Sequence, residues 1–332
     1  MKALILKNAQ NPELEIVEMG RPSPGPGEVL VRMKAAALNR RDLFITMGMY
    51  PGLREGAILG SDGCGVVERV HDSGDIEWEG EEVIINPNVE WGRDPKVQSP
   101  SYRVLGMPDN GTFSEYMVVG VDRLVRKPAH LNPEQSAALP LTGLTAYRAL
   151  FTHAQIRSGQ KLLVTGIGGG VSQMVLKLGL SVEAECYVTS GNEEKIQRAM
   201  ETGAKAGFNY REQNWQKSEK IPSSGFDVII DSAGGEAINN YIQVVAPGGK
   251  IVTYGSTTGK PKDLDIFRLF WKQASLQGST MGNDEEFLKM VDYVSEHEII
   301  PEIDKVALFD NILSQFERMR KSEHYGKLVV VF

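Results

Sequence analysis

The chain has 332 residues, with 36 Lys and Arg, 43 Asp and Glu, five His and two Cys, and its net charge at pH 7 is −7. Roughly 100–200 residues per domain predicts about two domains. This net negative charge excludes a polyanion as a partner, because the chain has no surplus of Lys and Arg to neutralise phosphates. Two cysteines, Cys64 and Cys186, cannot form a disulfide framework or a four-thiolate zinc site. Without a membrane-length apolar run or a secretory signal, we expect a cytoplasmic enzyme with no nucleic-acid or membrane partner.

The first part of the chain, to about residue 125, is typical of short strands separated by Gly and Pro. The expected strands are 1–6, 27–38, 64–70, 81–87 and 113–120. Residues 22–28, PSPGPGE, exclude a helix or a central strand there, because proline cannot donate to the ladder. This pattern predicts a small antiparallel barrel or sandwich.

From about residue 160 the pattern changes to strands alternating with helices. The expected strands are 161–165, 184–189, 206–210, 226–231, 250–255 and 275–280, and the expected helices include 172–180, 193–203 and 236–245. Short apolar strands separated by helices predict a doubly wound parallel sheet. A further helical stretch over 285–296 and a closing strand at 326–332 follow.

A glycine-rich turn lies between the first expected strand of this sheet and the helix after it. Its residues are Gly166, Gly168, Gly169, Gly170 and Val171. Glycines allow such a turn to approach a pyrophosphate, which sits at the helix N-terminus in dinucleotide-binding folds. Val171 departs from the third glycine of the fingerprint, and a plain structural turn is the alternative. The surrounding strands and helices favour a dinucleotide site.

The end of the second strand of this sheet favours NADP over NAD. An NAD site carries Asp or Glu there for the ribose hydroxyl, whereas this chain has Ser190, with Lys195 and Tyr210 following. A hydroxyl, an ammonium and a phenol together suit a 2′-phosphate. The alternatives are a capping box from Ser190 to Glu193, a solvated helical face for Lys195 and a core-edge position for Tyr210.

Other candidate cofactor contacts lie beyond later strands, where doubly wound sheets form their ligand crevice. They are Ser232, Ala233, Gly255, Ser256 and Gly282, with Thr145 on the helix leading into the domain. Turn glycines and helix caps are the alternative interpretation of these residues.

Several segments, taken in order, resemble the medium-chain dehydrogenase/reductase superfamily, and specifically its zinc-free branch of quinone-oxidoreductase-like enzymes. The segments are GEVLVRMKAAALNRRDL (27–43), GSDGCGVV (60–67), GTFSEY (111–116), LPLTGLTAYRAL (139–150), DVIIDSAGG (227–235) and YGKLVV (325–330). The resemblance implies an α/β protein in which a GroES-like, β-rich catalytic domain, 1–140 completed by 283–332, accompanies a Rossmann domain, 141–282. It also implies a homodimer or homotetramer.

The sequence departs from the zinc-type alcohol dehydrogenases at their metal positions. Asn39 stands where they carry a catalytic Cys, Ser61 and Asp62 replace a His-Glu pair, and the third position falls at about Leu141. The lobe 86–111, which elsewhere carries four cysteines, has none. Asn, Ser and Leu do not supply the ligands that zinc requires. We therefore expect no zinc, and Cys64 is interpreted as a buried core thiol.

These observations predict an NADPH-dependent oxidoreductase that transfers hydride to a small quinone or α,β-unsaturated carbonyl. Asn39 is the first candidate for stabilising the developing oxyanion, and Tyr50 or Arg41 the candidate donor or proton source, with a surface charge as the alternative for Arg41. Asp42 and Asp62 are interpreted as structural. The alternatives are an enone or enoyl-thioester reductase, a zinc-independent alcohol dehydrogenase, and a non-catalytic, crystallin-like NADPH-binding protein.

Strand 275–280 is expected to be the last of the parallel sheet. An unprotected edge strand invites pairing with its copy in a second chain. This edge is the expected dimer contact.

Overall fold

A computed structural model describes all residues from 1 to 332, and the chain forms two compact units. The first comprises Met1–Thr142 and Gly282–Phe332, and the second comprises Gly143–Met281. These limits differ by at most two residues from the domains expected from the sequence. None of the helices in the chain is long and apolar enough to cross a lipid bilayer.

The first unit is built on a seven-stranded sheet in the order β16-β17-β3-β4-β5-β9, with β8 also paired to β3. Two further pairs, β1-β2 and β6-β7, complete it. The strands are β1 (Lys2–Asn8), β2 (Glu13–Glu18), β3 (Glu28–Ala37), β4 (Asp62–Val70), β5 (Glu82–Ile85), β6 (Asn88–Val89), β7 (Arg103–Val104), β8 (Tyr116–Gly120), β9 (Leu124–Arg126), β16 (Ile303–Leu308) and β17 (Lys327–Val331).

Helices border this sheet, and short 3-10 turns join its strands. The helices are α1 (Arg40–Thr46), α2 (Pro133–Ala137), α8 (Asp284–Glu296) and α9 (Ile312–Arg320), and α3 (Pro140–Tyr147) runs from the first unit into the second. The 3-10 turns are Ser73–Trp78, Val121–Arg123 and Phe309–Asn311. Helix α8 begins where the Asn283 and Glu286 side chains bond each other's backbone N–H groups, which supplies partners that the first turn lacks.

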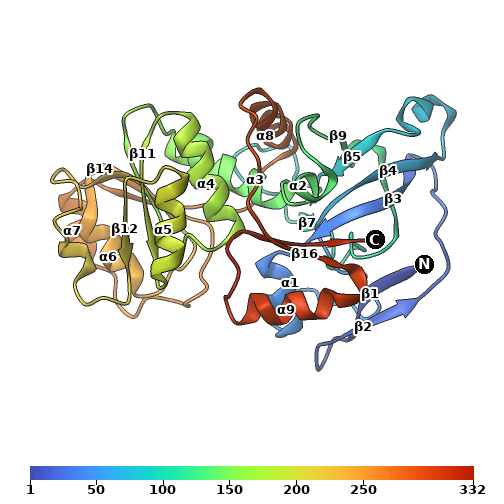
Figure 1. The fold of residues 1–332 in the computed structure, drawn as a ribbon, viewed down its shortest axis with the longest axis horizontal. Coiled ribbons are helices and arrows are strands. Elements are labelled where there is room, and N and C mark those ends of the chain that lie inside the picture. Colours follow the sequence, from blue (N-terminus) through green and yellow to red (C-terminus); the bar gives the residue numbers. More distant parts are fainter. The chain divides into compact units, whose positions relative to one another are not determined.

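The second unit contains a six-stranded, wholly parallel sheet in the order β12-β11-β10-β13-β14-β15. Figure 1 labels its strands β11, β12 and β14. The strands are β10 (Lys161–Val164), β11 (Glu185–Ser190), β12 (Ala206–Asn209), β13 (Phe226–Asp231), β14 (Val245–Thr253) and β15 (Ser275–Gly278). The helices are α4 (Gly170–Ser181), α5 (Glu193–Thr202), α6 (Ala237–Val244) and α7 (Ile266–Trp271), with a π-helical turn at Arg148–Ala154 and a 3-10 turn at Trp215–Lys217.

Helices cover both faces of this parallel sheet. Leu163 and Tyr187 share an apolar core with Ile238 and Ile242 of α6. On the opposite face, α4 approaches closely enough that a Cβ at Gly179 would lie 2.6 Å from the Leu162 side chain. The sheet order reverses between β10 and β13, so the carboxyl ends of these two strands form the switch point where such sheets bind ligands.

Candidate active site

Three adjacent strands of the first unit bring Asn39, Asp62 and Lys327 to one edge of the sheet. Strand β3 pairs antiparallel with β17 on one side and with β4 on the other. The start of β17, the end of β3 and the start of β4 therefore meet at the same edge, with Ala37 opposite Asp62 and Leu38 bonded to Leu328. Lys327 is far away in the sequence, and the sheet alone makes it a neighbour of Asn39.

The side chains of Asn39, Asp62 and Lys327 form a buried triad. The Lys327 Nζ donates to Asn39 Oδ1 and to Asp62 Oδ2, at 2.7 Å each. Asn39 Nδ2 also donates to Asp62 Oδ2, at 2.9 Å, while Asp62 Oδ1 accepts the backbone N–H of Leu141 at 2.8 Å. The three residues are between 0% and 5% exposed, so their charges are balanced within the triad and away from water.

Arg41 is committed to the protein rather than to a substrate. Its guanidinium donates to the carbonyl oxygens of Val104, Leu105 and Met107, and to the hydroxyls of Tyr50 and Ser61. These contacts use all five N–H groups that arginine has. The side chain is 10% exposed, so the interpretation of Arg41 as a surface charge is wrong.

Tyr50 lies beside Arg41, whose guanidinium carbon sits 4.6 Å from the centre of the phenol ring. The Tyr50 hydroxyl accepts from Arg41 Nε at 3.3 Å, and no donated hydrogen bond from this hydroxyl is formed within the protein. Arg41 therefore acts as a support for Tyr50, and of these two predicted donors only Tyr50 keeps a proton to give.

Asp42 is fully buried next to the triad. One carboxylate oxygen accepts the backbone N–H of Asn39 at 2.8 Å, and the other has no hydrogen-bond partner. Burial raises the pKa of Asp42 to about 6, although the positive charges of Arg41 and Lys327 act in the opposite direction and Asp62 reinforces the rise.

This raised pKa predicts a pH-dependent stability. Between pH 4 and 6 the folded chain binds a proton at Asp42 that the unfolded chain has released, so the free energy of unfolding falls as the pH rises. Relative to Asp42→Asn, the wild type should lose up to about 3 kcal/mol across this window. Urea unfolding of both proteins from pH 4 to 8 measures the difference, and parallel pH curves would contradict it.

The glycine-rich turn lies at the carboxyl end of β10, and α4 begins at Gly170 with Gly169 as its N-cap. Gly166 has φ +62°, a conformation that favours glycine. The hydroxyl of Ser172 donates to the carbonyl oxygens of Gly166 and Gly169, at 2.8 Å each, and holds the turn closed. Gly168 precedes the cap, and Val171 is half-buried in the first turn of α4.

Asp231 organises the strand ends next to this turn. Its carboxylate accepts the Thr165 hydroxyl at 2.8 Å and the backbone N–H groups of Ala233 and Gly234 at 3.0 and 2.8 Å. Asp231 ends β13 and was not among the predicted site residues. The sequence does hold a signal for this role, because Asp231 ends an apolar strand and directly precedes the candidate contacts Ser232 and Ala233.

The turns after β13 and β14 lie against each other. The hydroxyl of Thr258 donates to the carbonyl oxygen of Ala233 at 2.9 Å, and a Cβ on Gly255 would lie 2.9 Å from the carbonyl oxygen of Ser232. Ser256 closes its own turn through a 2.7 Å bond to Gly259. Four predicted contacts, Ser232, Ala233, Gly255 and Ser256, are thus brought together beside the glycine-rich turn.

Ser190 ends β11, and the alternative interpretation of Ser190 as the N-cap of a capping box is wrong. The N-cap of α5 is Asn192, whose side chain accepts the backbone N–H of Lys195 at 3.1 Å. Ser190 Oγ instead accepts the N–H of Asn192 at 3.2 Å. The bond between Asn192 and Lys195 fixes the backbone of Lys195 in the first turn of α5.

Tyr210 and Arg211 lie close to the end of β11. Tyr210 bonds the carbonyl oxygen of Ser190 through its backbone N–H at 3.1 Å and is 52% exposed. A Cβ on Gly191 would lie 2.9 Å from the Tyr210 ring and 2.7 Å from Arg211 Nε. Tyr210 is therefore not a core-edge residue, and Arg211 adds a positive charge that the sequence analysis missed.

Two further predicted contacts lie at the limits of the second unit. Thr145 is buried within α3, with its hydroxyl 3.8 Å from the sulfur of Met281. Gly282 directly follows Met281 and belongs to the first unit.

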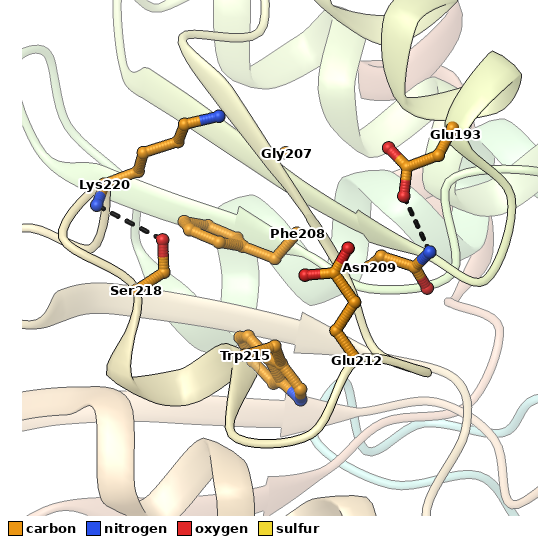
Figure 2. Close-up of a pocket in the computed structure, with 8 residues that line it drawn as sticks. All are labelled: Glu193, Gly207, Phe208, Asn209, Glu212, Trp215, Ser218 and Lys220. Carbon is orange, nitrogen blue, oxygen red and sulfur yellow. Dashed lines mark hydrogen bonds between the residues drawn. The ribbon is translucent and has the colours of Figure 1, made fainter.

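A separate pocket of about 130 Å³ lies beside β12 (Figure 2). Its lining residues are Glu193, Gly207, Phe208, Asn209, Glu212, Trp215, Ser218 and Lys220. Asn209 donates to Glu193 at 2.6 Å within it. None of the predicted cofactor residues lines this pocket.

Both units of the chain match known protein families. The sequence family described as "Alcohol dehydrogenase GroES-like domain" matches residues 25–129, and the one described as "Zinc-binding dehydrogenase" matches residues 170–296. The "Zinc-type alcohol dehydrogenase-like protein YogA" of Leptosphaeria maculans is 35% identical, covering 96% of this chain and 94% of that protein.

Two further proteins extend the comparison. The "Quinone oxidoreductase" of Mus musculus is 27% identical, covering 80% of this chain and 76% of its own length. Among solved structures, one titled "NAD-dependent alcohol dehydrogenase" has a TM-score of 0.91 and 31% identity, with both chains covered completely.

Proposed function

Because the chain belongs to the medium-chain dehydrogenase/reductase superfamily and is an oxidoreductase of that family, we propose that it uses NADPH to reduce a small quinone or α,β-unsaturated carbonyl without zinc. The buried triad carries this proposal. Asn39 and Asp62 stand at sequence positions where zinc-type relatives carry their Cys and His-Glu motifs, and here the two side chains bond each other and the ammonium of Lys327. The mouse quinone oxidoreductase gives independent support for the substrate class.

The family description implies zinc, but the donor groups at this site do not fit it. Zinc is held by thiolate, imidazole or carboxylate, whereas Asn39 offers an amide and Leu141 only a backbone N–H directed at Asp62. The Asp62 carboxylate already accepts three N–H groups. Burial raises the pKa of Cys64 to about 12, so its thiol stays protonated.

The lobe 86–111 is closed by contacts that need no metal. The rings of Trp91 and Tyr102 meet edge to face, with centroids 5.2 Å apart. Arg103 donates to Asp109 at 2.8 Å and to Glu90 at 2.9 Å. These contacts hold the lobe where relatives carry four clustered cysteines.

The second unit fits a dinucleotide. The turn 166–170 presents the N-terminus of α4, the natural position for a pyrophosphate. Asp231 holds Thr165 and the turn after β13 beside it. When bound, NADPH supplies the hydride.

The first unit supplies a hydrogen bond to the substrate. Asn39 Nδ2 carries two N–H groups, of which Asp62 takes one. The other is available for the oxygen on which negative charge develops. A conjugated acceptor spreads this charge over several atoms, so a neutral donor suffices, and Tyr50 is the candidate proton source.

Steady-state rates with NADPH and a panel of quinones and enones test this function, with simple alcohols plus NADP as the comparison. We expect turnover with conjugated acceptors. Faster oxidation of simple alcohols would contradict the substrate class. NADPH binding without turnover of any panel member would favour the non-catalytic alternative.

The preference for NADP should depend on Lys195. With Ser190, Tyr210 and Arg211, it places hydroxyl and positive groups near the end of β11, a strand that ends in Ser190 rather than in an acidic residue for the ribose hydroxyl, while the nearby Glu193 bonds Asn209. Because a charge-assisted hydrogen bond to the 2′-phosphate stabilises bound NADPH, we expect NADPH to bind about 10–100-fold more tightly than NADH. Lys195→Ala should reduce this ratio and leave NADH binding nearly unchanged.

Fluorescence titration with both cofactors measures these dissociation constants. Lys205→Ala is the control, because Lys205 lies before β12 at the other end of the sheet and pairs with Glu185. Equal affinities for NADH and NADPH in the wild type would contradict the assignment.

The proposal includes a homodimer formed along β15. This edge strand is exposed along its whole length, and the nearby helix α7 exposes Phe267, Phe270 and Trp271 at 68%, 59% and 74%. An open edge and unpartnered aromatic rings suit a second copy of the chain. Sedimentation at micromolar concentration should give at least twice the chain mass, and Trp271→Glu should shift it towards one chain. A wild-type mass of one chain would contradict the dimer.

A cytoplasmic location is part of the same proposal. The two free, buried cysteines support it, since unpaired thiols are typical of reducing compartments.

A further inference from the structure

The ammonium of Lys327 contacts Asn39 and Asp62, two residues that stand at sequence positions where the zinc-type alcohol dehydrogenases carry their Cys and His-Glu motifs. We propose that it is the resident cation of this site, excluding a divalent metal and holding the Asn39 amide in position for the substrate. The positioning role rests on the proposed function, whereas the exclusion of a metal does not. Lys327 was not among the predicted site residues, although it is the one charged residue of the apolar strand 327–331.

Lys327 determines which way the Asn39 amide faces. An ammonium only donates and an ionised carboxylate only accepts. The Asn39 atom facing Lys327 at 2.7 Å must therefore be the oxygen, and the atom facing Asp62 at 2.9 Å must be the nitrogen. The opposite orientation would set two donors and two acceptors against each other. The remaining Nδ2–H of Asn39 is consequently fixed in direction.

The same ammonium competes directly with a metal ion. A divalent cation bound by Asn39 Oδ1 and Asp62 Oδ2 would use the two oxygens that Nζ already contacts. Two cations sharing these oxygens would repel each other strongly at such short range in a buried site. Lys327 is 3% exposed and Asp62 is fully buried. The ammonium therefore cannot move into water without leaving the buried Asp62 carboxylate unpaired, which is costly.

Lys327 is thus a positioning residue that acts through Asn39. Groups that orient a ligating or reacting side chain typically contribute about 10–100-fold to activity. Lys327→Met keeps the length of the side chain but removes its charge and donors. We expect it to slow hydride transfer from saturating NADPH to a quinone by about 10–100-fold, with the NADPH dissociation constant within about twofold of wild type.

The double variant Lys327→Met/Asp62→Asn separates positioning from stability. Lys327→Met alone leaves the Asp62 carboxylate buried without a counter-charge, so its melting temperature should fall clearly. Removing both charges should recover much of that loss while the hydride-transfer rate stays low. Lys327→Arg, which keeps the charge and donors, should recover part of the rate. Lys305→Met, on the exposed part of β16, is the matched control and should change neither property.

Several outcomes would overturn the inference. A Lys327→Met enzyme with the wild-type rate, or a double variant that recovers rate together with stability, excludes the positioning role. Additive losses of melting temperature in Lys327→Met and Asp62→Asn would show that the two charges do not depend on each other.

Titration with Co²⁺ tests whether Lys327 excludes a divalent metal, and it needs no enzymatic turnover. Titration of the wild type with Co²⁺ should produce no ligand-field absorption and no thermal shift. Stoichiometric binding at micromolar Co²⁺ that Asp62→Asn abolishes would overturn the proposal. If the wild type reduces no quinone or enone, the proposed function fails, while this titration and the stability comparison still decide whether Lys327 is the resident cation.

Discussion

Replacing Asn39 with alanine should lower kcat for quinone or enone reduction by about 10²–10³-fold, the usual effect of removing one donor to an oxyanion. The Lys327–Asp62 pair remains at 2.7 Å without the amide, so the fold should survive. NADPH affinity should stay near wild type, because the predicted cofactor residues nearest the glycine-rich turn all belong to the second unit.

Single-turnover hydride transfer and NADPH titration of Asn39→Ala measure the two quantities separately. Asn11→Ala, in an exposed turn, is the control. A variant that keeps the wild-type kcat would remove Asn39 from the mechanism. A variant that loses NADPH binding and kcat together would show a general defect rather than loss of a donor.

Gly111→Ala should strongly destabilise the first unit. A Cβ at this position would overlap the carbonyl oxygen of Gly60 and lie 2.7 Å from Gly106 Cα and from the Leu59 carbonyl oxygen. These neighbours are backbone atoms held by the bonds of Gly111 to Ile58 and of Thr112 to Gly60, so they cannot simply rotate away. We expect a loss of about 3 kcal/mol or more in the free energy of unfolding.

Urea unfolding measures this loss, and Gly20→Ala is the control because a Cβ there meets nothing within 4 Å. Gly111→Ala should also impair catalysis in the fraction that folds, since Gly60 leads directly into Ser61 and Asp62. Equal stability of the two variants would contradict the close backbone approach.

The parallel sheet was predictable because its strands are short apolar runs with glycine-rich turns at their ends. Strand 226–231 agrees with β13, and strand 161–165 differs from β10 by one residue. Strands β2 and β16, for example, were not predicted. In β16 the apolar residues Val306 and Leu308 are exposed, and β2 is exposed at both ends and half-buried between them, so neither strand shows a clear alternation of buried apolar and exposed polar residues.

The site was only partly predictable. The sequence identified Asn39 and Asp62 through their place in family motifs, but the Lys327 partner lies 265 residues from Asp62 and only sheet pairing joins them. The role of Arg41 depends on five acceptors contributed by three distant segments. Spacing along the chain holds no information on such long-range bonds.

The central claim is that the protein reduces a quinone or enone without zinc, and an assay of metal-free protein tests it most directly. Purified, untagged protein should be treated with a strong chelator, analysed for zinc, and assayed with NADPH. The buried triad predicts the full rate at well under one zinc per chain, with no gain when zinc is returned. Loss of the rate on chelation and its recovery with one zinc per chain would contradict the account.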